Sequence, residues 1–104
     1  MFRAFIAEYP DHGLTDNAVY WSGEASLALK DYPAAMRAFR RVLRAYPSSA
    51  KVPWARLKIG EALLASGKTA EGAERLRDLL RTHPGTEAAS EALRLLEGSA
   101  ERKM

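Results

Sequence analysis

Three prolines set 37 residues apart constrain this chain more than any other feature. Pro10, Pro47 and Pro84 each end a similar nine-residue segment: FRAFIAEYP, FRRVLRAYP and LRDLLRTHP. A fixed period of about 20 to 50 residues is typical of repeat proteins, in which each unit buries its apolar face by stacking on a neighbour. Stacked units create an extended concave surface. The spacing therefore predicts a repeat protein and favours binding over catalysis.

The composition of the 104 residues is that of one small globular domain rather than a disordered chain, because 47% are hydrophobic and 28% are charged. The net charge is only +3, and acidic residues are interspersed with basic ones, which argues against nucleic-acid binding. The absence of cysteine excludes a disulfide framework and thiol chemistry. No apolar run approaches the length of about 18 residues that would span a membrane, and the first residues lack the pattern of a signal peptide.

Apolar residues between the prolines recur at helical intervals of three and four, without strand-like alternation. Thr15 or Asp16 can cap one helix, Ser48 or Ser49 can cap another, and Gly67 can supply a left-handed turn at a helix end. The sequence predicts an all-α fold of about six helices, the first of them short: 2–9, 15–30, 33–45, 50–66, 69–83 and 86–98.

The repeat divides the single domain, residues 1–104, into five parts. We expect a truncated remnant of a preceding repeat at 1–10, full repeats at 15–47 and 50–84, a terminal capping helix at 86–98 and a frayed polar tail at 99–104.

The two full units share a pattern of small and large residues. Superposing them aligns Gly23 with Gly60, Ala35 with Gly72, Phe39 with Leu76 and Pro47 with Pro84. This order and spacing resemble the tetratricopeptide repeat, whose usual period is about 34 residues. The glycines should let the two helices of a unit cross closely, and the large residues should fill the space to the next unit. The resemblance implies a superhelix of helical hairpins.

The longer period and the segment NAVYWSGE, followed by DYP, YPSSAK and HPGT, narrow the resemblance. Over about residues 2–98 the chain closely resembles the carboxy-terminal domain of the periplasmic Tol-Pal accessory proteins, the YbgF/CpoB family. It departs from that family at Ser22, Trp54 and His83.

That resemblance implies a non-enzymatic periplasmic adaptor that binds a TolA-like inner-membrane protein and couples outer-membrane constriction at cell division to peptidoglycan synthesis. It also implies an amino-terminal coiled coil that trimerises and an earlier helix, both outside this chain. Tetratricopeptide lipoproteins of outer-membrane assembly share the long period, so a structural scaffold that docks through its surface is the alternative. A cytoplasmic regulatory repeat domain is a third possibility.

In tetratricopeptide arrays the first helix of each unit faces the concave side, which defines a predicted partner-binding groove. Its residues, spaced by three, four and seven on each helix, are Asn17, Tyr20, Trp21 and Glu24, then Trp54, Lys58 and Glu61, then Arg94. Amide groups can hydrogen-bond a peptide backbone, aromatic rings supply rigid contact area, and cations can pair with carboxylates. Alternatively, Tyr20 and Trp21 pack between helices, in the core. Trp54 is the better candidate for an exposed anchor.

Four arginines follow one side of a predicted helix: Arg37, Arg40, Arg41 and Arg44. These arginines could form a phosphate-binding face. We expect that they form a solvated convex surface instead. In the scaffold alternative this arginine face does the docking.

The chain offers little for catalysis. His12 and His83 lie in different units without a second ligand pattern, so we expect no metal site, and a stacking role for His83. No glycine-rich phosphate loop occurs, and no closed pocket is implied around the carboxylates. We therefore expect that the chain is not an enzyme and that it has no catalytic residue and no bound cofactor.

Phe2, Phe5 and Ile6 lie on a segment that should pack against a preceding helix absent from this chain. Large apolar side chains left in water forgo about 1.5–3 kcal/mol each. We expect this edge to be covered by self-association into a homo-oligomer, with exchange of the first helix as one route.

Overall fold

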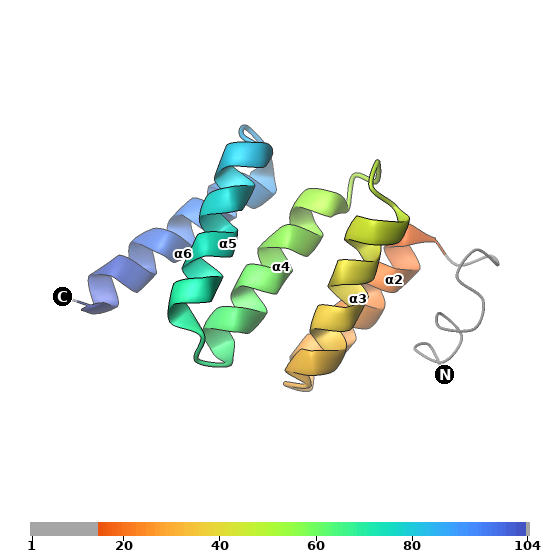
Figure 1. Cartoon of the computed structure of the whole chain (residues 1–104), viewed down its shortest axis with the longest axis horizontal. Coiled ribbons are helices and arrows are strands. Elements are labelled where there is room, and N and C mark those ends of the chain that lie inside the picture. Colours follow the sequence, from red (N-terminus) through yellow and green to blue (C-terminus); the bar gives the residue numbers. More distant parts are fainter. Residues whose placement is uncertain (1–14, 104) are drawn as a thin grey trace.

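The computed structural model describes residues 15–103, with side-chain burial through residue 98, and all its regular elements are α-helices. They are α2 (Asp16–Ala28), α3 (Tyr32–Ala45), α4 (Val52–Ala65), α5 (Thr69–Thr82) and α6 (Glu87–Lys103). The expected all-α, tetratricopeptide-like fold is confirmed (Figure 1). The predicted first helix, the self-association edge at Phe2, Phe5 and Ile6, and His12 all lie outside the described residues.

The helices form two antiparallel hairpins and a final helix. α2 packs on α3, α4 packs on α5, the contact of α3 with α4 joins the hairpins, and α6 packs on both α4 and α5. In Figure 1, α3 and α5 lie in front of α2 and α6, with α4 between the two pairs. We call the side that presents α3 and α5 the outer face, and the side that presents α2, α4 and α6 the inner face.

Side-chain caps fix the amino ends of three helices. Oxygens of Thr15, Asp31 and Thr86 each accept a hydrogen bond from the backbone N–H three residues on, at 3.1, 3.2 and 3.1 Å. Gly67 and Gly85 have positive φ angles of 91° and 83°, which let the chain reverse after α4 and after α5. The predicted cap at Thr15 and the left-handed turn at Gly67 are confirmed.

α4 begins differently from the expectation. It starts at Val52, and Lys51 occupies the cap position without a side-chain hydrogen bond, so the predicted serine cap of a helix from residue 50 is wrong. The Ser49 hydroxyl instead accepts a hydrogen bond from the Lys51 N–H at 2.9 Å and donates one to the Asp16 carboxylate. The hydroxyl therefore ties the loop between the repeats to the start of α2.

α6 continues to Lys103, past the expected helix end at residue 98, and the frayed state of the tail stays a prediction. The segment after Gly98 contains no proline, and its alanine, glutamate, arginine and lysine are good helix formers. A single glycine costs too little to end such a helix.

Apolar side chains between the helices form two clusters that share α4. The first joins α2, α3 and α4 around Phe39 and Val42, and the second joins α4, α5 and α6 around Leu76 and Leu79. Trp54 of α4 packs against both clusters. The position of α4 is therefore fixed from both sides.

Two glycines set the distance between the helices of each hairpin. A Cβ atom added to Gly23 would lie 2.7 Å from the Phe39 ring, and one added to Gly60 would lie 2.5 Å from Leu76 Cδ2. Phe39 and Leu76 are both fully buried, so neither side chain has free space to move into. The close crossing predicted from the aligned glycines is confirmed.

We expect Gly60→Ala to lower the free energy of unfolding by about 1–3 kcal/mol, because the new methyl group overlaps a buried side chain. Gly98→Ala is the matched control, since an added Cβ there meets nothing within 4 Å. That variant should be unchanged or up to about 1 kcal/mol more stable, through helix propensity. Urea unfolding followed by circular dichroism measures both, and equal stabilities would contradict the close crossing.

Candidate functional site

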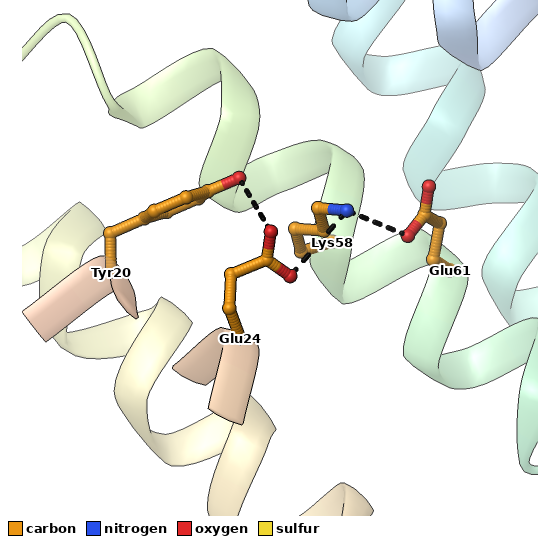
Figure 2. A network of polar contacts seen from close by, with 4 residues as sticks. All are labelled: Tyr20, Glu24, Lys58 and Glu61. Atoms are coloured by element: carbon orange, nitrogen blue, oxygen red, sulfur yellow. Dashed lines mark hydrogen bonds and ion pairs between the residues drawn. The ribbon is translucent and has the colours of Figure 1, made fainter. Parts of the chain in front are cut away.

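The inner face carries a network of polar contacts that links the two repeats (Figure 2). The Tyr20 hydroxyl of α2 donates a hydrogen bond to the Glu24 carboxylate at 3.5 Å. Lys58 Nζ of α4 lies 3.5 Å from Glu24 Oε1 and 3.3 Å from Glu61 Oε1. One ammonium group therefore bridges a carboxylate of the first repeat and a carboxylate of the second.

The three charged side chains of this network remain partly open to solvent, with exposed fractions of 20% for Lys58, 24% for Glu24 and 26% for Glu61. Ion pairs at such positions contribute only about 0–1 kcal/mol to stability. Apolar packing therefore holds the repeats together, and the network mainly fixes where charge is displayed. Two carboxylates around one ammonium give this strip a net negative charge.

Trp21 lies beside the network with half of its surface, 51%, exposed. Its ring packs edge to face against Tyr20, with ring centroids 5.3 Å apart, and its indole N–H donates a hydrogen bond to Asn17 Oδ1 at 3.2 Å. Lys51 Nζ lies 4.8 Å from the Tyr20 centroid and 5.4 Å from the Trp21 centroid. The indole is thus exposed and yet held in one orientation by three neighbours.

The structure reverses the expected exposure of the two tryptophans. Trp54 is half-buried and packs against both core clusters, so the expectation that it is exposed is wrong, and Trp21 is the exposed one of the two. Trp54 faces the core because α4 packs against helices on both sides. Tyr20 combines the two alternatives, core and groove. Its ring is buried in the first cluster, and its hydroxyl group reaches the network.

Arg94 lies apart from the other predicted groove residues. Its guanidinium pairs with Glu91, one turn earlier on α6, and no described residue of α2 or α4 pairs with it. Lys51, by contrast, was missed by the sequence interpretation. It lies in the loop before α4, where helical spacing gives no signal, and only its closeness to the start of a helix could have suggested it.

Two ionisable groups near this face have shifted pKa values. Burial, and then the negative charges of Glu24 and Glu61, raise the pKa of the Tyr20 phenol well above its ordinary value of 10.0. The hydrogen bond from Ser49 is the main cause that lowers the pKa of the Asp16 carboxyl below its ordinary value. Tyr20 therefore stays a neutral hydrogen-bond donor at neutral pH, and Asp16 stays an anion.

The other residues singled out in the sequence are the four arginines of α3 and His83. Arg37, Arg40 and Arg44 of α3 are exposed, as expected of a solvated surface, while Arg41 is half-buried. His83 is half-buried, and its Nδ1 lies 2.9 Å from the Thr82 hydroxyl. Within residues 15–103, no group of three or more metal-ligating side chains comes together.

Residues 12–101 match the YfiO family, described as an outer membrane lipoprotein. The chain belongs to this family. The match supports the tetratricopeptide-like resemblance and a role in protein interaction, and it does not support the YbgF/CpoB family in particular. No curated protein matches the chain. None of the helices in the described part of this YfiO-family chain is long and apolar enough to cross a membrane.

We expect the raised pKa of Tyr20 to make the free energy of unfolding depend on pH in the alkaline range. Its folded-state pKa lies above the unfolded value of about 10, so above that pH the unfolded chain loses a proton that the folded chain keeps. The free energy of unfolding should therefore fall as the pH rises past 10. Urea unfolding at a series of pH values measures this decline, which Tyr20→Phe should reduce and the control Tyr32→Phe should preserve. An equal decline in both variants would contradict the assignment.

Proposed function

We propose that this YfiO-family chain is a non-enzymatic protein-binding module of an envelope scaffold, and that it holds a segment of a partner protein against its inner face. The observation that carries the proposal is the combination of exposure and rigidity at Trp21. Large aromatic side chains whose orientation is fixed before binding are typical hot spots of protein interfaces, because little conformational entropy is lost when they are covered.

The surroundings of Trp21 suit a polypeptide ligand. The half-exposed network of Glu24, Lys58 and Glu61 offers both signs of charge within one strip, which can pair with side chains of a partner and fix its register. The Asn17 amide group at the edge of the indole can hydrogen-bond a peptide backbone. Contacts of this kind bind and orient a partner, and none of them activates a nucleophile.

Membership in an outer membrane lipoprotein family supports a scaffold in the cell envelope. The segment NAVYWSGE, which contains Asn17 and Trp21, supports a second candidate, a TolA-like partner in cell division, because it carries the resemblance to the Tol-Pal adaptors. Both candidate functions use the same face, and they differ in the partner protein that binds to it.

We expect Trp21→Ala to weaken partner binding by about tenfold or more, the loss typical of a hot-spot residue. Leu29→Ala is the matched control, because Leu29 is the most exposed large apolar side chain among those described, at 81%, and lies beyond the end of α2. A photo-crosslinking amino acid placed at position 21 or at position 29 in cells, followed by mass spectrometry, identifies the partner. The affinity of the purified partner for each variant is then measured and compared with its affinity for the wild type.

Helical circular dichroism should be the same for both variants, since neither side chain is part of the core. Crosslinks from position 21 to outer-membrane assembly proteins would support the scaffold, and crosslinks to a TolA-like protein would support the Tol-Pal candidate. Equal partner affinities of Trp21→Ala and Leu29→Ala would overturn the inner-face proposal.

A further inference from the structure

The outer face contains a hollow of about 460 Å³ between the two repeats, where α3 faces the end of α4 and the start of α5. Met36 of α3 and Leu63 of α4 provide apolar lining, and both are core residues that reach its floor. Arg37, Arg40 and Lys68 lie around it, with Glu71 the one acidic residue. The hollow therefore has an apolar floor and a basic rim.

A second, smaller hollow continues along the same side of α4. Leu43, Arg56, Ile59 and Arg75 line it, so it too lies between α3, α4 and α5. The α4 residues of the two hollows, from position 56 to position 66, recur at intervals of three and four and so share one helical face. Ten residues of helix span about 15 Å. We call the two hollows together the inter-repeat groove, because their α4 residues lie along about that length of one side of the helix.

The charge of the inter-repeat groove is unbalanced. Its lining contains one carboxylate and five cations: Arg37, Arg40, Arg56, Lys68 and Arg75. No carboxylate of the described residues lies within ion-pair distance, 4.0 Å, of any of these five. Lys58, Arg81 and Arg94 elsewhere on the molecule do have such partners. Five cations without such partners and only one carboxylate therefore line this groove.

One of these cations also has an unmet hydrogen-bond donor. The Arg56 Nε atom is buried and has no acceptor among the described residues. Buried donors in proteins are nearly always satisfied, because a donor removed from water without an acceptor is costly. The Arg41 Nε atom, outside the groove lining, likewise has no acceptor among the described residues. The smaller hollow, of about 20 Å³, has room for about one water molecule, which can supply the acceptor for Arg56.

We propose that the inter-repeat groove binds an acidic, amphipathic segment of a partner protein, whose apolar side contacts Met36 and Leu63 and whose carboxylates pair with the surrounding arginines. Charge complementarity selects this occupant, because a net excess of four positive charges borders an apolar floor. The inter-repeat groove is on the face opposite to Trp21, so this second surface is independent of the proposed function of the inner face.

The shape of the groove distinguishes this occupant from an anionic membrane. A bilayer surface presents headgroups over a broad plane, which would reach the exposed arginines of α3 and not the apolar floor between the repeats. A polypeptide segment can place carboxylates on the rim and apolar side chains on the floor at the same time. Only the amphipathic segment would therefore contact both the basic rim and the apolar floor.

The test uses a fluorescein-labelled peptide, about four helical turns long, with glutamate and leucine at amphipathic helical spacing. We expect the wild-type chain to bind it, as measured by fluorescence anisotropy. Arg37→Glu with Arg40→Glu should weaken binding by about tenfold or more, because charge pairs become repulsive. The control combines Arg44→Glu with Arg77→Glu, which makes the same change in net charge at exposed arginines outside the groove lining. It should weaken binding by less than about threefold.

Further arms separate the remaining explanations. Peptides with glutamine for glutamate, or with serine for leucine, should both bind more weakly, because one removes the charge and the other removes the contact with the floor. Trp21→Ala should bind the peptide as the wild type does, so failure of the inner-face proposal and failure of this one are distinguishable. Thermal unfolding checks that the arginine variants remain folded.

Equal losses in the two arginine pairs would overturn the proposal, since binding would then depend only on net charge. Equal binding of the leucine and serine peptides would also overturn it. So would the absence of peptide binding together with binding to vesicles of phosphatidylglycerol and phosphatidylethanolamine, because the surface would then recognise a membrane. Self-association seen by light scattering would also contradict the proposal if Arg37→Glu with Arg40→Glu abolished it and Arg44→Glu with Arg77→Glu preserved it, because a second copy of the chain would then occupy the groove.

Discussion

The close crossing of paired helices at Gly23 and Gly60 is the constraint on which the rest of the structure depends. Each glycine leaves room for one large side chain of the opposite helix, Phe39 or Leu76, to fill completely. That packing fixes the distance between the helices of each hairpin, and because close-packed interiors do not deform continuously, it also fixes their orientation. The two hairpins then meet through α3 and α4, and every surface feature follows from where this packing places the helices.

α4 connects the two sides of the molecule. Its core residues belong to both apolar clusters, so it cannot shift toward one repeat without losing contacts in the other. The same helix directs Lys58 into the polar network of the inner face and Ile59 into the inter-repeat groove of the outer face. Adjacent residues on a helix point in directions about 100° apart. One rigid helix thus holds both candidate surfaces in a constant relation, which suits a scaffold that contacts more than one partner.

The all-α repeat architecture could be predicted from the sequence, because its signals are local, whereas the start of α4 and the end of α6 could not. Proline spacing, helical periodicity and the aligned glycines depend on residues close along the chain, and each has one structural outcome. The exposure of single side chains could not be predicted in the same way. Trp21 and Trp54 lie on equivalent first helices, and only the packing of α4 against helices on both sides decides that Trp54 is half-buried while Trp21 is open. Lys51 acts from a loop, where periodicity carries no information, so its position over two rings was not predictable.

The two faces differ in whether their cations have carboxylate partners. On the inner face, Lys58 is held between two carboxylates, so a partner would meet a strip with one net negative charge whose cation already has partners, and the strip would mainly fix the partner's register. In the inter-repeat groove, cations from three helices converge without such partners, and their mutual repulsion costs free energy in the unbound chain. An incoming acidic segment would relieve that repulsion, which would add to its attraction to the groove.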